Sequence, residues 1–342
     1  MADGGTKTGA GRVTIRTVAE DAGVSVAAVS KVMRNAYGVS EALRLKVEAS
    51  IARLGYRPSV AARGMRGQTF TLGVLLVGID NPILPLIYGG IEGVAEAAGY
   101  KIMVGVGAAR MQTEARLIEQ MLDNRMDGLI LVASRIAGDV LERYARQIPI
   151  VVVGHHEPSA RHFDTVNNDD RQGARIAVGA LIDAGHRDIA MLALPHPEDH
   201  QANVSPQRER GYREAMAAAG LSSFARIVHM PQPEVPRHAE MTALLSGPDR
   251  PRAVFCWSDL DAIPLINVAH ELGLRVPADV AVVGYDNSQV AAMPVVGLTS
   301  VDQDARGLGE AAARALLSRI GGRSEVSHVI LHPRLVCRTS HR

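Results

Sequence analysis

Seven short, continuously apolar runs constrain the fold of this chain, because segments with helical spacing separate them. The runs occupy residues 71–79, 100–106, 128–133, 148–154, 188–194, 252–257 and 280–286, and the helical segments lie near 86–98, 113–124, 170–184, 208–219, 259–272 and 305–320. This pattern is typical of parallel strands that are buried on both faces of a sheet. Seven strand–helix units are more than we expect in a single sheet. The sequence therefore predicts two α/β lobes, the second beginning near Asp170.

The polar residues that follow these runs define a candidate ligand cleft. In open α/β sheets, ligands bind outside the carboxyl ends of the strands. The residues expected at those ends, lining a polar cleft between the lobes, are Asp80, Asn81, Ser134, Arg135, His155, His156, Ser258, Asp259, Asp286 and Asn287.

A different pattern precedes the lobes, between Val13 and Arg34. Apolar residues recur at helical spacing from Ile15 to Ala22, Thr14 can cap this helix, and Gly23 stands where the chain must turn with a positive φ. Ser25 can cap a second helix. The side chains that this helix is expected to bury are Val29, Val32 and Met33. Two short helices around a tight turn predict a helix-turn-helix, whose second helix enters the major groove of DNA.

A third helix is expected from Ser40, its N-cap, to Gly55, which ends it. Its apolar face carries Leu43, Val47, Ile51 and Leu54. The following segment, residues 57–67, is short, basic and rich in small residues. Helices shorter than about 12–15 residues rarely persist alone, so this segment is expected to fold only when DNA or a partner subunit supports it.

The distribution of charge agrees with a DNA-binding N-terminus. Residues 1–67 carry 11 Lys and Arg against 5 acidic residues, a net charge of +6, which leaves −5 for the rest of a chain whose formal net charge is +1. A basic module joined to a mildly acidic body is expected when one end docks on phosphates.

Three further features restrict the class of protein. The two cysteines, Cys256 and Cys337, provide neither a disulfide framework nor a metal-ligand cluster. Residues 1–12 lack the apolar core of a signal peptide, and no apolar run approaches the roughly 20 residues of a membrane helix. We therefore expect a disordered N-terminal arm and a cytoplasmic, nucleoid-associated protein with no membrane partner.

Ten sequence blocks follow one another between Val13 and about Arg338. They read VTIRTVAEDAGVSVAAVSKVM, VSEALRLKVEASIARLGYRPS, AARGMRG, NPI, MDGLIL, GHRDIAML, RERGYREAM, SDLDA, ELGLRVPADVAVVGYDN and LTSVDQD. In this order the blocks resemble the lactose/galactose repressor (LacI/GalR) family of bacterial transcription regulators. The resemblance implies a three-helix helix-turn-helix domain followed by a two-lobed effector domain that is similar to periplasmic binding proteins.

The resemblance also implies which residues contact DNA. Val26, Ala27 and Lys31 match the base-reading positions of the second helix. Lys31 can donate to guanine O6 and N7, whereas the two apolar side chains are expected to contact thymine methyl groups. The positions that match phosphate contacts are Thr14, Ser25, Ser30 and Asn35. The short basic segment matches the hinge helix of the family, with Ala62 and Met65 placed in the minor groove.

For a small-molecule effector, the family positions fall on Arg208, Asp286 and Gln303. A guanidinium and a carboxylate together can hold the vicinal hydroxyls of a sugar or a related polyol. The chain departs from the family by Ser258 in place of Asn and by Ile83 and Leu84 in place of an aromatic pair. Trp257 and Tyr285 are the aromatic candidates that could compensate. The predicted effector residues are Asp80, Ser134, His155, Arg208, Trp257, Ser258, Asp286 and Gln303.

These expectations combine into one organisation. The arm is 1–12, the DNA-binding domain 13–58, the hinge 59–68 and the effector-binding and dimerisation domain 69–342, with lobe 1 at about 69–169 and 303–332 and lobe 2 at about 170–302 and 333–342. The predicted protein is a homodimeric regulator, most simply a repressor, of a pseudo-palindromic double-stranded DNA operator, controlled by a small molecule, with no cofactor, no metal and no enzymatic activity.

The residues leave two other functions open. A cytoplasmic sugar-binding protein or a sugar-modifying enzyme could use the same two lobes, but the sequence contains no P-loop, GxSxG or HExxH motif. The Gly105–Gly107 stretch lacks the third glycine of a dinucleotide fingerprint. His196 and His200 are four residues apart, but prolines at 195 and 197 favour a loop over a helical metal site.

Overall fold

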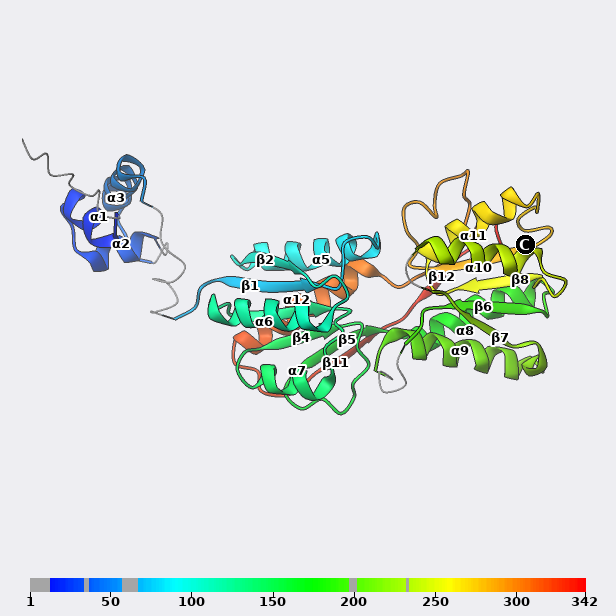
Figure 1. Ribbon diagram of the computed structural model, residues 1–342. Coiled ribbons are helices and arrows are strands. Elements are labelled where there is room, and N and C mark those ends of the chain that lie inside the picture. Colours follow the sequence, from blue (N-terminus) through cyan, green and yellow to red (C-terminus); the bar gives the residue numbers. More distant parts are fainter. Residues whose placement is uncertain (1–12, 34–36, 57–66, 197–201, 232–233) are drawn as a thin grey trace, which may run out of the picture. The chain divides into compact units, whose positions relative to one another are not determined.

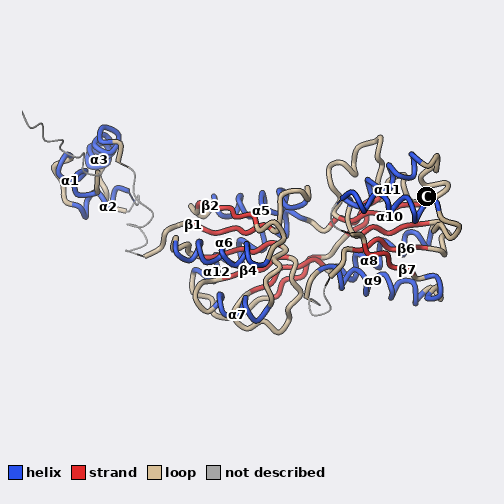
Figure 2. The backbone as a smooth tube through the Cα atoms, in the orientation of Figure 1, coloured by secondary structure: helices blue, strands red, loops and turns tan. Residues whose placement is uncertain are grey.

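The computed structural model describes residues 13–33, 37–56, 67–196, 202–231 and 234–342 (Figures 1 and 2). It divides into two compact units, Met1–Thr69 and Phe70–Arg342. Among the described residues, every helix is too short or too polar to cross a lipid bilayer.

The described residues of the first unit form three helices, α1 (Ile15–Asp21), α2 (Val26–Met33) and α3 (Glu41–Leu54). Each begins at the residue that the sequence predicts. The hydroxyl oxygens of Thr14, Ser25 and Ser40 each accept a hydrogen bond from the backbone N–H of the residue three positions later, at 3.1–3.4 Å. Gly23 has a φ of 59°, as the turn between α1 and α2 requires. The predicted caps and turn are confirmed.

The three helices share one small core, and Asp21 ties α1 to α3 at its edge. The buried side chains are Val18, Ala19, Ala22, Val29, Val32, Val47 and Tyr56, with the predicted Met33 only partly buried. The Asp21 carboxylate accepts hydrogen bonds from Ser50 and from Arg53. These two donors hold the pKa of Asp21 below its ordinary value.

The described residues of the second unit form two sheets, and each sheet with the helices that cover it is named lobe 1 or lobe 2. The lobe 1 sheet is parallel, in the order β11-β5-β4-β3-β1-β2. Its strands are β1 (Thr71–Leu76), β2 (Lys101–Val106), β3 (Gly128–Val132), β4 (Ile150–Val153), β5 (Asp164–Asn168) and β11 (His328–Leu331). Its helices are α5 (Ile83–Ala97), α6 (Met111–Asp123), α7 (Gly138–Ala145) and α12 (Ala305–Ile320).

The lobe 2 sheet has the order β12-β10-β9-β8-β6-β7, and only β12 runs antiparallel to its neighbour. Its strands are β6 (Ile189–Ala193), β7 (Arg226–His229), β8 (Ala253–Cys256), β9 (Ala281–Tyr285), β10 (Thr299–Asp302) and β12 (Arg334–Val336). Its helices are α8 (Asp170–Asp183), α9 (Val204–Ala218), α10 (Glu234–Ser246) and α11 (Asp259–Glu271), with a 3₁₀ turn at Ser222–Phe224.

Both sheets are covered by helices on both faces, as the apolar runs predict. In β1, Leu72, Val74 and Leu76 pack with α5 and α12, whereas Leu75 points to the other side and packs with α6 and α7. In lobe 2, α8 and α9 cover one face and α10 and α11 the other. Side chains alternate across a strand, so continuous apolar runs fill both cores.

Several elements were absent from the sequence prediction. The strands β5, β7, β10, β11 and β12 and the helices α7 and α10 were not predicted. The clearest case is β5, whose five residues are buried although four of them are polar. Asp164 in this strand pairs with Arg319 at 2.9 Å and with Arg323, which compensates for its burial. A strand stabilised by ion pairs from a distant helix has no apolar pattern to reveal it.

The position of α5 depends on an unusually close crossing with α12. A methyl group on Gly90 would collide with the backbone carbonyl of Arg306, and one on Gly309 would collide with that of Ile87. The two helix backbones therefore approach more closely than any side chain larger than hydrogen allows. This contact holds the second and third turns of α5 against α12, and the first turn of α5 follows β1 at the carboxyl edge of the sheet.

We expect Gly90→Ala to lower the free energy of unfolding by about 1–3 kcal/mol, because the added methyl overpacks the crossing. Gly93, in the same helix, has open space around it. Gly93→Ala is the matched control and should be neutral or stabilising by up to about 1 kcal/mol. Urea unfolding of the two variants checks this. Equal midpoints for both would show that α5 and α12 do not cross closely.

Candidate functional site

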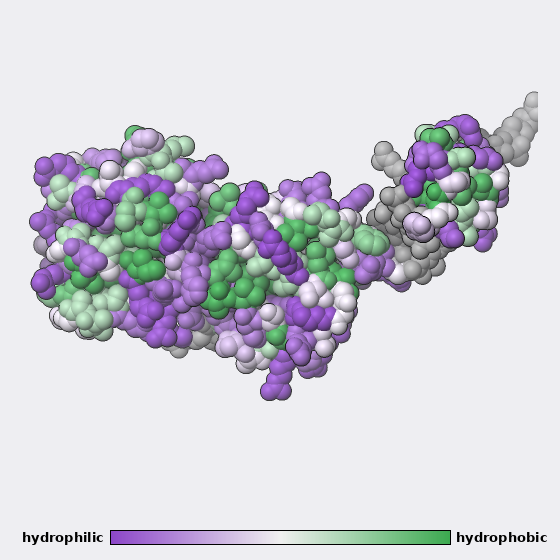
Figure 3. Space-filling view, turned by 180° about the vertical axis from the view of Figure 1, so that it is seen from behind, coloured by the Kyte–Doolittle hydropathy of each residue, from purple (hydrophilic) through white to green (hydrophobic). Residues whose placement is uncertain are grey.

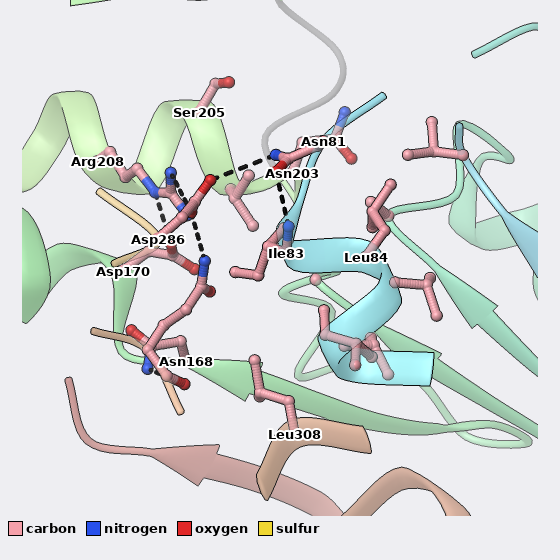
Figure 4. Close-up of a pocket in the computed structure, with 18 of the residues that line it drawn as sticks. Asn81, Ile83, Leu84, Asn168, Asp170, Asn203, Ser205, Arg208, Asp286 and Leu308 are labelled. Carbon is pink, nitrogen blue, oxygen red and sulfur yellow. Dashed lines mark hydrogen bonds and ion pairs between the residues drawn. The ribbon is translucent and has the colours of Figure 1, made fainter. Parts of the chain in front are cut away.

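A cavity of about 140 Å³ lies in the second unit, where the carboxyl ends of strands from both sheets meet (Figure 4). Its apolar side comes mainly from lobe 1, with Val77, Ile83, Leu84, Ile87, Val132, Val153 and Leu308. Its polar side chains and its tryptophan are Asn81, Arg135, Asn168, Asp170, Asn203, Ser205, Arg208, Trp257, Asp286 and Gln303. The cavity thus offers one apolar face and one face of hydrogen-bonding groups.

The guanidinium of Arg208, on α9, is the central group of the polar face. Its side chain is only 3% exposed. Nε donates to Oδ1 of Asp170 at 2.8 Å, and Nη1 donates to the backbone oxygen of Trp257 at 2.6 Å. The guanidinium carbon lies 3.6 Å from the ring centroid of Tyr285 and 4.7 Å from that of Trp257. Ion pairing and cation–π contacts together compensate for burying this charge.

Asp170, the first residue of α8, is the principal charge partner of Arg208. One carboxylate oxygen pairs with Arg208, and the other lies 2.9 Å from Nε2 of His156. Burial alone would raise the pKa of Asp170, but Arg208 and His156 outweigh it and hold the pKa below its ordinary value. Asp170 is therefore ionised, and both of its carboxylate oxygens already have a partner.

Asp286 has a different state, although it faces the same guanidinium. It follows β9 with a φ of 107°, a region that non-glycine residues seldom occupy. Gln303 donates to its Oδ1 at 2.7 Å, whereas Nη1 of Arg208 is 4.0 Å away. Burial raises the pKa of Asp286 to about 7, because the more distant Arg208 only partly offsets it. Asp286 is the carboxyl group with capacity for a further partner.

Two of the contacts that join the lobes involve Asn81 and Asn203, which line the cavity. Nδ2 of Asn81, between β1 and α5, donates to Oδ2 of Asp286 at 3.3 Å (Figure 4). The other end of this amide is held by the backbone N–H of Ile83, which donates to Oδ1 at 3.0 Å. His155, after β4, forms an isolated antiparallel bridge with Asn203, just before α9. The separation of the lobes is therefore linked directly to groups that line the cavity.

Four of the eight predicted effector residues line this cavity together, namely Arg208, Trp257, Asp286 and Gln303. The other four, Asp80, Ser134, His155 and Ser258, are not among its lining residues. Of the ten strand-end residues expected in the cleft, three line this cavity, namely Asn81, Arg135 and Asp286. The strand-end rule finds the right edge of the sheet, but the turn that follows each strand decides where the side chain points.

The four residues outside the lining have other places. Asp80 is exposed. The Ser134 hydroxyl donates to Glu114 at 2.8 Å and accepts from the backbone of Ile136. The imidazole of His155 is buried edge-on to Phe163, with 6.3 Å between ring centroids. Ser258 is buried at the N-cap position of α11.

The prediction missed several lining residues, of which Asp170 matters most. An Asp in the first turn of a helix is ordinarily explained by its favourable interaction with the helix dipole. The sequence around Asp170 therefore gives no indication that it pairs with Arg208. Asn168, Asn203 and Ser205 likewise resemble common strand-end and helix-start residues. Asn81 was expected in the cleft as a strand-end residue but was not among the eight effector residues.

In the first unit, the outer surface of α2 carries the predicted DNA-reading residues. Ala27 and Lys31 are exposed and one helical turn apart, so they share a face. Val26 is partly buried and packs against the core. Thr14 and Ser25 are exposed cap residues, and Ser30 is partly buried. Asn35, Ala62 and Met65 lie outside the described residues.

Two family models match this chain. Residues 14–59 match the model for bacterial regulatory proteins of the lacI family, and residues 178–341 match that of a periplasmic binding protein-like domain. The chain is also similar to the HTH-type transcriptional repressor PurR of Salmonella arizonae. The two are 34% identical over 334 residues, which are 96% of each chain.

Solved structures give the same picture over both units. The transcriptional regulator CelR in complex with cellobiose has a TM-score of 0.70 and 30% identity, covering 96% of this chain and 100% of that one. The lac repressor dimer bound to operator and the anti-inducer ONPF has a TM-score of 0.82 and 25% identity, covering 96% and 99%.

The raised pKa of Asp286 predicts a pH dependence of stability. Its folded pKa of about 7 exceeds the ordinary 3.8, so the folded protein binds an extra proton between these values. The free energy of unfolding should fall, relative to Asp286→Asn, as pH rises from about 4 to 7, by up to about 1.4 kcal/mol per pH unit. Denaturant unfolding of both proteins across this range measures the difference. Parallel profiles would mean that Asp286 is ionised throughout.

Proposed function

This chain belongs to the lacI family of bacterial regulatory proteins and is a transcriptional repressor of that family, and we propose that it binds a pseudo-palindromic operator as a homodimer. We further propose that a small molecule in the cavity of the second unit controls this binding. The regulator would act in the cytoplasm, where bacterial DNA lies. The proposed organisation is a DNA-binding domain at 13–58, a hinge at 59–68 and an effector-binding and dimerisation domain at 69–342.

In this proposal, α2 reads the operator through its exposed face. Lys31 donates to guanine, while Ala27 and the adjacent edge of Val26 contact thymine methyl groups. Thr14, Ser25, Ser30 and Asn35 contact phosphates, and Ala62 and Met65 of the hinge enter the minor groove. Support comes from the exposure of Ala27 and Lys31 on one side of a helix whose other side is buried.

The homodimer is supported by an exposed apolar edge on lobe 1. The edge strand β2 exposes Met103, Val104 and Val106, and Met111 is exposed at the start of α6. Hydrophobic areas lie among hydrophilic ones on the face drawn in Figure 3. An exposed apolar edge strand can pair with strands of other molecules and cause aggregation. A second copy that covers it would protect the edge and bring two DNA-binding domains onto one operator.

Arg208 is the observation that carries the effector proposal. It is a buried guanidinium at the cavity, with Asp286, Gln303 and Asn81 arranged around it. Trp257 adds a buried Nε1–H for which the described residues supply no hydrogen-bond acceptor. Such groups match a ligand with several hydroxyls on one side, and the aliphatic side chains of lobe 1 match an apolar ring face. We propose a sugar or a related polyol, the class to which the cellobiose of the CelR complex belongs.

The control mechanism in this proposal is a change in lobe closure. A ligand that enters between Asn81 and Asp286 alters the contact that joins the lobes. If operator and ligand favour different lobe arrangements, each weakens the binding of the other; if they favour the same arrangement, each strengthens it. The ligand is an inducer in the first case and a corepressor in the second.

The DNA-binding part is tested with Lys31→Ala in gel-shift selection on a palindromic operator pool. Loss of the base contact should relax discrimination at one base pair per half-site and cost about 1–3 kcal/mol there. Lys46→Ala, which removes an exposed charge on α3, is the control and should leave the selected sequence unchanged. An equal loss for Lys31→Ala on every sequence would make Lys31 a phosphate contact.

The effector is found with a thermal-shift panel of sugars, sugar phosphates, polyols and nucleobases. A ligand at 100 times its Kd stabilises the folded protein by roughly 2.7 kcal/mol. Trp257→Phe keeps an aromatic face but removes the indole N–H, so it should weaken the selected ligand about tenfold, the equivalent of one hydrogen bond. Tyr144→Phe, on α7 away from the cavity, should have no effect.

The panel can also contradict the proposal. A response to nucleobases without any response to sugars or polyols would make the ligand class wrong. Unchanged affinity in Trp257→Phe would remove the indole N–H from the site.

A further inference from the structure

A second cluster of ligand-type side chains lies in lobe 2, outside the lining of the effector cavity. Its members are His196, which follows β6, Glu209 on α9, and His229 at the end of β7. Nε2 of His196 lies 3.0 Å from Oε1 of Glu209, and Nε2 of His229 lies 2.9 Å from the same oxygen. The three ligand atoms all lie within 4.8 Å of one another.

The fold holds these three groups in place. β6 and β7 are parallel neighbours, with Ala193 paired to His229, so the two histidines emerge at the same edge of the sheet. The two imidazole rings are nearly perpendicular, with centroids 6.0 Å apart. The Glu209 side chain is only 5% exposed, and its second oxygen accepts from Arg213 at 3.2 Å. The cluster is a preformed arrangement and not a chance meeting of mobile surface side chains.

The geometry of the cluster suits a cation. The Nε2 atoms of His196 and His229 converge on one carboxylate oxygen of Glu209, at 3.0 and 2.9 Å. When Nε2 of each neutral imidazole carries a lone pair in place of a proton, the same three atoms become ligands for a metal ion.

The donor set selects the class of metal. Imidazole nitrogens suit zinc and its neighbours among the transition metals, whereas calcium and magnesium prefer oxygen ligands alone. Two histidines and one glutamate make three protein ligands, which leave one tetrahedral position for water. His229 is 45% exposed and also lines a surface hollow with Tyr212, Arg213 and Ile227, which gives an ion a path to the cluster.

We propose that His196, Glu209 and His229 bind one divalent transition-metal ion of the zinc class. The site fastens the start of α9 to the ends of β6 and β7. Glu209 directly follows Arg208, and His196 comes two residues after Leu194, and both Arg208 and Leu194 line the effector cavity. An ion here therefore stabilises one edge of that cavity. The proposal does not depend on which effector the cavity binds.

Sequence spacing does not reveal this site, because its ligands come from three separate segments. The HxxxH spacing of His196 and His200 includes one of the three ligands only. The partners of His196 in the described structure are instead 13 and 33 positions further along the chain, on α9 and β7.

The test uses the full chain, stripped of metal with a chelator and titrated with zinc chloride by calorimetry. We expect saturable binding of one ion per chain. His229→Ala, which changes a largely exposed side chain, should weaken binding at least 100-fold without unfolding the protein. His238→Ala is the matched control, because His238 lies 2.9 Å from Glu271 in an exposed pair that belongs to no three-ligand cluster among the described residues. It should bind zinc as the unchanged protein does.

Cobalt substitution gives a second readout that separates a built site from surface adsorption. Co²⁺ in the proposed site should give the strong visible absorption of a tetrahedral complex, which Glu209→Gln and His229→Ala both lose. Absence of saturable zinc binding would overturn the proposal. Equal affinity in His229→Ala and the unchanged protein, or a cobalt spectrum unaffected by either variant, would also overturn it.

Discussion

The buried guanidinium of Arg208 is the interaction on which the arrangement of lobe 2 around the cavity depends. It joins the start of α8 through Asp170, the end of β8 through the Trp257 carbonyl and the last residue of β9 through the Tyr285 ring. Removing one partner of a buried ion pair typically costs 3–5 kcal/mol, because a charge is left without compensation. The guanidinium of Arg208 is therefore held in place before any ligand binds. A ligand that contacts it does not have to order this side chain.

The two carboxyl groups near Arg208 have different roles: Asp170 stabilises the guanidinium, and Asp286 is available to contact a ligand. Asp170 receives the close ion pair and a lowered pKa, whereas Asp286 is 4.0 Å away with a pKa raised to about 7. Asp286 is held by Gln303 and by Asn81 from the other lobe. The group that retains capacity for a ligand is thus also hydrogen-bonded to the other lobe, as the proposed control by lobe closure requires.

Local patterns predicted the parts of the molecule that local chemistry determines. The caps at Thr14, Ser25 and Ser40, the turn at Gly23 and the apolar strands of both sheets could all be inferred from neighbouring residues. Long-range pairing could not. The polar strand β5 depends on arginines that follow Asp164 by 155 and 159 residues, and Ser134 turns toward Glu114 because α6 packs beside it. Arg208, Trp257, Asp286 and Gln303 were predicted in the cavity, but Asp170 was not, because its role exists only once α8 and α9 have packed.

Reciprocal coupling between operator and ligand tests the central claim most directly. The dissociation constant of the operator should be measured with and without saturating ligand selected by thermal shift, and that of the ligand with and without saturating operator. If one lobe equilibrium links the cavity to the DNA-binding unit, both constants must change by the same factor, typically about 5–150-fold. Operator affinity that is unchanged by a ligand bound in the cavity would contradict the claim.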